Sequence, residues 1–186
     1  MLDFTYQAFQ ARIVFGPGKV SELPSEVEKL GARAVLVIST ASQRAVADAA
    51  IADLRTSVAA RIDGAVMHVP RENVVTAVEL AQREKCDCVL AIGGGSAIGV
   101  AKGIALETGL PIVAVPSTYA GSEMTDIWGI SEGDGKTTGR DACVVPKTVI
   151  YDPDLTRGLP GKLAGPSGIN AMAHSVEALY AQNRNP

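Results

Sequence analysis

The sequence predicts an α/β protein built on a doubly wound parallel sheet. Strand-like and helix-like segments alternate from residue 11 to residue 115 with short connections, which is the pattern that such sheets produce. Several strand-like segments are continuous apolar runs, as expected when both faces of a sheet are covered. Polar stretches follow three of the predicted strands, at residues 39–40, 93–96 and 116–125. At the carboxyl ends of parallel strands they can converge on one ligand.

The chain is organised around CVLAIGGGSAIGVAKGIAL, residues 88–106. Its apolar run, residues 89–92, predicts a buried strand, and Ser96 is expected to cap the following helix. Between them lie three residues that allow a tight turn and a close backbone approach to a ligand, Gly93, Gly94 and Gly95. The free N–H groups of that helix would form a phosphate site. Neither the G-x-G-x-x-G fingerprint nor the P-loop fits, so an ordinary glycine-rich turn is the alternative interpretation.

The other segments follow in order. We expect further strands at residues 11–15, 34–38, 65–69, 112–115 and 148–151, and helices at residues 20–30, 43–54 and 73–85. A hairpin is expected to run from residues 126–130 through a turn at 132–135 and back through 140–145. Residues 152–166 contain three prolines and are expected to link this unit to a helix over residues 167–181.

Composition excludes several classes of protein. Of the 186 residues, 47% are hydrophobic and 20% charged, which is typical of a folded globular chain. A net charge of −3 without a basic run argues against a nucleic-acid partner. No apolar segment approaches the roughly 20 residues of a membrane span, and the first residues lack a signal-peptide pattern. The three cysteines, Cys86, Cys88 and Cys143, are expected to be reduced thiols in a cytoplasmic protein.

The helix predicted at residues 167–181 places Asn170 and His174 four residues apart, hence on one face. An aspartate at the first position would make this pair half of a metal site, whereas an asparagine is a poor ligand for a divalent cation. A lone histidine on an apolar helix is most often a hydrogen-bonded core residue. That interpretation stands beside a functional one.

Five stretches, taken together, resemble the iron-containing alcohol dehydrogenase family. They are FGPGKV (15–20), GGGSAIGVAKGIAL (93–106), VPSTYAGSEMT (115–125), YDPDLT (151–156) and SGINAMAHSVEALYA (167–181). The resemblance covers essentially the whole chain and is closest to the branch of the family that reduces maleylacetate. It implies a dinucleotide-binding α/β domain at residues 1–158 and the truncated beginning of an all-α second domain at residues 159–186.

The resemblance also implies NADH or NADPH as the cofactor. The residues expected to bind it are Thr40, Gly93, Gly94, Gly95, Ser96, Ser117, Thr118, Tyr119 and Ser122. Thr40 stands where many members of the family carry an aspartate that repels a 2′-phosphate. An uncharged side chain at this position should therefore permit NADPH alongside NADH.

Three departures from the metal-dependent members predict that iron or zinc is absent or weakly held. Gly99 replaces the aspartate of GGGS-x-x-D, Asn170 replaces that of D-x-x-x-H, and the loop STYAGSE is compact. For the reaction, His174 is the candidate that polarises the substrate ketone or donates a proton. The implied substrate is a small dicarboxylate. Lys136 and Arg140 are candidates for holding its carboxylates, with simple solvation as the alternative.

Other interpretations remain open at this point. A metal-dependent alcohol or glycerol dehydrogenase is opposed by Gly99 and Asn170, and a metal-dependent synthase of related fold by the lack of metal ligands. A nucleotide-binding or assembly module without catalysis is the alternative from another class. A homodimer is the assembly that we expect. Oxidation of NADH by maleylacetate would separate these interpretations.

Overall fold

The computed structural model describes residues 8–54, 57–65 and 68–181. Six parallel strands form one sheet in the order β1-β8-β5-β4-β2-β3. Their bounds are Arg12–Phe15 (β1), Val35–Ile38 (β2), Val58–Ile62 (β3), Cys88–Gly93 (β4), Ile112–Pro116 (β5) and Thr148–Tyr151 (β8). The predicted fold class is confirmed.

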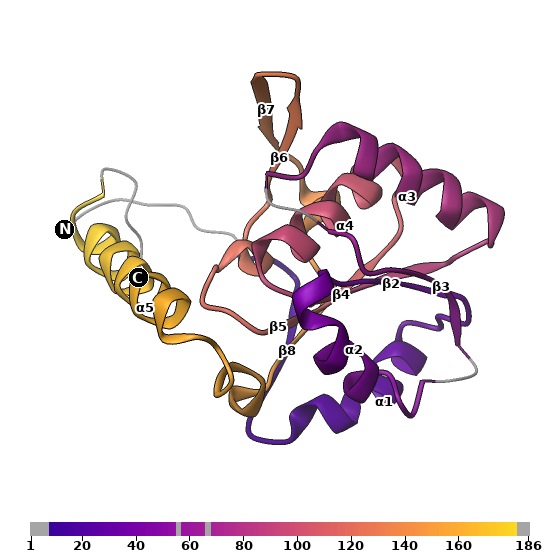
Figure 1. Ribbon diagram of the computed structural model, residues 1–186, viewed down its shortest axis with the longest axis horizontal. Helices are drawn as coiled ribbons and strands as arrows, with labels where there is room; N and C mark the ends of the chain where they lie inside the picture. The colour runs from indigo at the N-terminus through magenta and orange to yellow at the C-terminus, as the bar shows by residue number, and fades with distance from the viewer. Residues whose placement is uncertain (1–7, 55–56, 66–67, 182–186) are drawn as a thin grey trace.

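Helices cover both faces of this sheet (Figure 1). On one face lie α1 (Leu23–Lys29) and α2 (Arg44–Ala50), and on the other α3 (Arg71–Arg83) and α4 (Gly95–Thr108). Successive residues of a strand point to opposite faces. Accordingly, Leu36 belongs to the core under α3 and α4, whereas Val37 belongs to the core above α1 and α2. The continuous apolar strands are explained by these two cores.

The order of the strands reverses at β2. The chain passes from β2 outward to β3, then crosses back to β4 on the other side of β2. Ligands of open α/β sheets bind outside the carboxyl ends of the strands at such a reversal. Residues 39–40 follow β2, and the glycine turn follows β4, so the topology places two of the three polar stretches at this point.

The prediction of a strand at residues 65–69 is wrong, because none of the described residues in this range belongs to a strand. The third strand is β3, residues 58–62, while Ala65 and Val69 are buried in loop conformation; residues 66–67 lie outside the described residues. β3 is an edge strand and only partly buried. It therefore needs no continuous apolar run, and its sequence VAARI gave a weaker signal than the buried loop.

The β6–β7 hairpin begins where expected but turns back earlier. β6 (Ile127–Glu132) pairs antiparallel with β7 (Gly135–Arg140), so the return strand precedes the expected residues 140–145. Only residues 133–134 separate the strands, because Gly133 adopts a positive φ of 55° that a tight turn requires. In Figure 1 the hairpin projects beyond the α3–α4 layer.

Helix boundaries also differ from the expected ones. Residues 20–30 divide into a 3₁₀ turn (η1, Lys19–Glu22) and α1, α2 ends at Ala50, and α3 begins after Pro70. α5 spans Gly161–Tyr180, so the expected linker at residues 152–166 is helical in its last part. Pro166 lies inside α5, where a proline removes one backbone hydrogen bond, so the three prolines of the expected linker do not all lie outside the helix. No residue of α5 is buried.

Within the part of the chain that the structure describes, no helix is both long and apolar enough to cross a membrane.

Candidate cofactor site

The glycine turn is built by three different backbone conformations. Gly93 ends β4 with a positive φ of 142°, which L side chains rarely adopt. Gly94 is the N-cap of α4, and Gly95 is the first helical residue. Ser96, expected to be the cap, lies inside the first turn instead, because the helix begins two residues earlier than that cap would place it. Since no side chain caps α4, its first N–H groups remain available to an anionic ligand.

The loop after β5 closes against this turn. The Ser117 N–H donates to the Gly93 carbonyl at 3.0 Å. A Cβ built on Gly94 would lie 2.8 Å from Thr118 Oγ1, so only glycine allows this approach. Ser117 is 1% exposed, and its hydroxyl oxygen has no partner among the described residues. The fold therefore brings together the two stretches that the sequence predicted to converge.

The two outer members of the predicted set also lie beside the turn. Ser122 lines a cavity of about 340 Å³ together with Gly95 and Ser96. Tyr119 is 44% exposed and lines a second cavity, of about 400 Å³, together with Thr118. A diphosphate at the beginning of α4 would thus have open space on either side of the loop.

Thr40 follows β2, in half-exposed surroundings with several charges. Its hydroxyl lies 3.1 Å from that of Ser42. The neighbouring Ser39 donates to Asp63, whose carboxylate also contacts Arg61 at 2.6 Å and Arg44 at 3.5 Å. Burial alone would raise the pKa of Asp63, but the hydrogen bonds from Ser39 and Arg61 hold it below its ordinary value. Asp63 therefore stays ionised, and its charge is balanced by the arginines.

These residues fit a dinucleotide. The uncapped helix beginning and the glycine backbone suit its diphosphate. The orphaned Ser117 hydroxyl offers a hydrogen bond, and the carboxyl end of β2 suits a ribose. An adjacent small-residue contact keeps this region compact, because a Cβ on Gly99 would lie 2.5 Å from Val69 Cγ2. An aspartate at residue 99 would collide with the loop as it stands.

The two residues considered as half of a metal site, Asn170 and His174, both lie on α5. His174 is on α5 with a side chain that is 69% exposed, and its Nδ1 lies 3.5 Å from Glu177 Oε2. Asn170 is exposed one turn earlier. Among the described residues no three His, Cys, Asp or Glu side chains gather in a metal-binding arrangement. His174 is also no core residue here, contrary to the commonest role of such a histidine.

One residue of α5 lines a cavity beside the loop that follows β5. Ala171 lines the cavity of about 400 Å³ with Tyr119 and Tyr151. His174 follows Ala171 by three residues and so lies near the same face of the helix. The two cationic candidates for the substrate differ. Lys136 lines the cavity beside Gly95, whereas Arg140 pairs with Asp126 at 2.9 Å.

Lys102 and Glu123 are buried polar groups that the sequence analysis did not single out. Lys102 is 1% exposed and reaches from α4 to the loop before β6. Burial lowers the pKa of its ammonium to about 8, although Glu123 and Asp126 favour the charged form. Glu123 is 3% exposed and accepts a hydrogen bond from the Tyr151 hydroxyl at 2.8 Å. The only sequence signal for the burial of Lys102 was its position inside an otherwise apolar helix.

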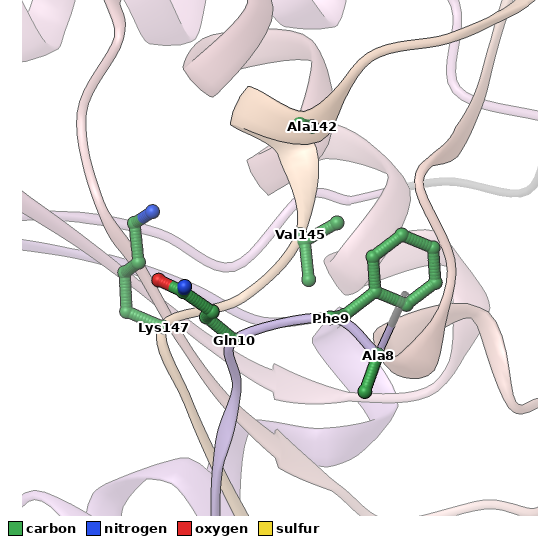
Figure 2. A pocket seen from close by; sticks show the side chains of 6 residues that line it. All are labelled: Ala8, Phe9, Gln10, Ala142, Val145 and Lys147. Carbon is green, nitrogen blue, oxygen red and sulfur yellow. The ribbon is translucent and has the colours of Figure 1, made fainter. Parts of the chain in front are cut away.

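A larger cavity, about 500 Å³, lies elsewhere (Figure 2). It is lined by residues that precede β1 and β8, namely Ala8, Phe9, Gln10, Ala142, Val145 and Lys147. These residues lie at the amino ends of the strands. Because ligands of such sheets bind at the carboxyl ends, we assign the cofactor to the smaller cavities beside the glycine turn.

This chain is similar in sequence and in fold to known proteins. The sequence profile of the family named "Iron-containing alcohol dehydrogenase" matches residues 10–153. Maleylacetate reductase 2 of Cupriavidus pinatubonensis is 48% identical over 99% of this chain, and maleylacetate reductase of Pseudomonas sp. strain P51 is 49% identical over 100%. These alignments cover 51% and 53% of the relatives, so the chain spans about half their length.

A solved structure gives the same result for the fold. The crystal structure of maleylacetate reductase from Agrobacterium tumefaciens superposes with a TM-score of 0.96 at 45% identity. The match covers 100% of this chain and 53% of that one.

Proposed function

Because this chain belongs to the iron-containing alcohol dehydrogenase family, we propose that it is the cofactor-binding part of an NAD(P)H-dependent reductase that converts maleylacetate into 3-oxoadipate in aromatic-compound degradation. The observation that carries the proposal is an identity of 48–49% to relatives named maleylacetate reductase over nearly the whole chain. The glycine turn at the strand-order reversal supports a dinucleotide as the cofactor.

When bound, a reduced nicotinamide would be the source of the hydride that reduces the carbon–carbon double bond conjugated with the substrate ketone. This chain holds the cofactor through the α4 N–H groups, Ser117, Thr118 and, at the ribose, Thr40. Reduction builds negative charge on the ketone oxygen, so a hydrogen-bond donor must face it. We assign that donor, or the proton donor to carbon, to His174. The assignment is supported by its position three residues after Ala171, which lines the 400 Å³ cavity.

The substrate dicarboxylate needs cationic partners. Lys136 lines the cavity beside Gly95 and is the better placed of the two candidates. Arg140 is engaged by Asp126 and would have to exchange that partner. The proposed domain boundary at residue 158 falls between the 3₁₀ turn η5 (Pro153–Thr156) and α5.

A metal ion is proposed to be absent or weakly held, although the family is named for iron. The support is chemical, since Asn170 offers a neutral oxygen where an anionic ligand is usual. Elemental analysis of dialysed enzyme tests this directly. Stoichiometric iron or zinc, together with activity lost on chelation, would refute it. A cytoplasmic location and a homodimer are likewise proposed; the described cysteines, which are all unpaired thiols, support the first.

The test of the activity is whether maleylacetate oxidises NADH or NADPH in the presence of the purified protein and without added metal. We expect the NADH absorbance to fall. Turnover only with an alcohol, NAD⁺ and added divalent metal would favour an alcohol dehydrogenase instead. Binding of NADH without turnover of either substrate would favour a nucleotide-binding module.

A further inference from the structure

Lys102 has an unusual environment for a lysine. It is the largest fully buried side chain among the residues that the structure describes, 1% exposed, and projects from the middle of α4. Its ammonium donates to the Thr125 carbonyl at 2.7 Å, to Thr125 Oγ1 at 3.0 Å and to the Ile127 carbonyl at 2.7 Å. Among the described residues no carboxylate lies within ion-pair distance of it. The buried charge is therefore satisfied by neutral oxygens of one short segment.

That segment is the far end of the cofactor loop, which we define as residues 117–127. The near end is held at the glycine turn, where Ser117 donates to the Gly93 carbonyl. Lys102 lines the same 340 Å³ cavity as Gly95 and Ser122, on the same side of α4. The loop is thus fixed to the strand–turn–helix unit at both ends, and its middle residues lie over the beginning of α4.

We propose that Lys102 is a positioning residue that holds the cofactor loop in place against the glycine turn. It acts through the carbonyls of Thr125 and Ile127 and does not itself touch the cofactor. The consequence for cofactor binding rests on the proposed function, whereas the effect on the loop does not.

The contacts explain why a neutral substitute should fail. Without the ammonium, two backbone carbonyls lose their donor, and the segment gains by turning them toward water. An unsatisfied buried group shifts such an equilibrium by roughly ten- to a hundredfold. The rest of the sheet has its own hydrogen bonds, so the opening should be confined to the cofactor loop.

The variant Lys102→Met removes the ammonium group and keeps an unbranched side chain up to the ε position. Its matched control is Lys147→Met, which removes an exposed lysine at the amino end of β8. We would measure peptide-resolved hydrogen exchange without cofactor and the emission of Trp128, the single tryptophan of the chain, which follows Ile127 directly. Affinity for NADH would be measured on the same preparations.

In Lys102→Met we expect exchange within residues 117–127 to rise roughly ten- to a hundredfold, with β4 unchanged. Trp128 emission should shift to longer wavelength, and NADH affinity should fall by a similar factor. The control should behave as wild type. Unchanged exchange in residues 117–127 would overturn the proposal.

If Lys102→Met unfolds globally, Lys102→Arg decides the matter, because it keeps the charge and the donors. Wild-type protection of residues 117–127 in that variant supports the proposal, and a folded protein with an unprotected loop overturns it. A failure of the wild type to bind NADH would contradict the proposed cofactor site. The hydrogen-exchange result would still test whether Lys102 holds residues 117–127 in place.

Discussion

A Cβ built on Gly94 would lie 2.8 Å from Thr118 Oγ1 and 2.9 Å from Thr118 Cγ2. The glycine turn is therefore closed to side chains by the protein itself, before any ligand is considered. Thr118 occupies the place that a side chain at residue 94 would need. The packing of Thr118 against Gly94 also sets the distance between the glycine turn and the cofactor loop.

Gly94→Val should accordingly abolish NADH binding. The branched side chain must push Thr118 and its loop away from the beginning of α4, where we place the diphosphate. Titration of NADH fluorescence measures the effect, and circular dichroism shows whether the variant is folded. Gly158→Ala is the control, since a Cβ there meets nothing within 4 Å. A folded Gly94→Val protein with wild-type NADH affinity would contradict the site.

Thr118→Ala provides a second test of the same contact. In the double variant Gly94→Ala, Thr118→Ala the collision is largely removed, so the fold should recover relative to Gly94→Ala alone. NADH affinity should recover only in part, because the added Cβ still lies where we expect the cofactor diphosphate to contact the backbone of the glycine turn. Full recovery would mean that Gly94 serves the packing of Thr118 alone.

The glycine turn was predictable because its signals are local. Adjacent glycines after an apolar run specify a turn at the end of a strand wherever that strand lies in the sheet. The exact helix beginning was not predictable, since Gly94 rather than Ser96 became the N-cap. Serine has a high propensity for the N-cap position. In this chain, however, Gly93 adopts a positive φ and the helix begins directly after Gly94.

Other features depend on tertiary packing and gave no such signal. The sequence around Ala65 and Val69 predicted a strand more strongly than the half-buried edge strand β3 did. Ala65 and Val69 are buried in a loop, because burial and strand formation are separate properties. Lys102 and Glu123 are buried only because partners distant in sequence satisfy them. Charged residues are ordinarily assigned to the surface, so their roles appear only once the loop and α4 are seen together.

Cofactor choice should depend on Thr40. An aspartate at this position would repel a 2′-phosphate, so Thr40→Asp should reduce NADPH use far more than NADH use. A like-charge contact in a partly shielded site costs on the order of 1–3 kcal/mol, about ten- to a hundredfold in relative efficiency. Steady-state rates with both cofactors measure the ratio. Thr40→Asn has a similar shape without charge and should leave the ratio nearly unchanged; an unmoved ratio in Thr40→Asp would refute this role.

The Tyr151–Glu123 hydrogen bond should contribute to stability. Glu123 is 3% exposed, and its second oxygen has no partner among the described residues. Tyr151→Phe removes the donor to the first oxygen, leaving a buried carboxylate without a hydrogen bond from this side. We expect a loss of about 1–3 kcal/mol in the free energy of unfolding. Urea unfolding tests this, with Tyr180→Phe on the exposed face of α5 as the control. Equal stability of the two variants would contradict the role given to the pair.

Glu26 should make the protein sensitive to acid. Its side chain is fully buried on α1 and accepts from Arg12 Nε at 2.7 Å and from Lys29 at 2.5 Å. The hydrogen bond from Arg12 is the main reason why the pKa of Glu26 is lowered, although burial opposes it. Because the folded pKa lies below the unfolded one, this stabilisation is present above the unfolded value of 4.5. It is lost as the pH falls through the folded value.

Glu26→Gln removes this titration and keeps the shape of the side chain. At neutral pH the variant should be less stable than wild type by about 1–2 kcal/mol, since the charge-assisted bond to Arg12 becomes an ordinary one. On acidification the difference should shrink, because wild type loses the same contribution when Glu26 takes up a proton. Urea midpoints measured across the acidic range test this. The exposed Glu28→Gln serves as the control, and a stability difference that stays constant with pH would show that Glu26 is not the group that titrates.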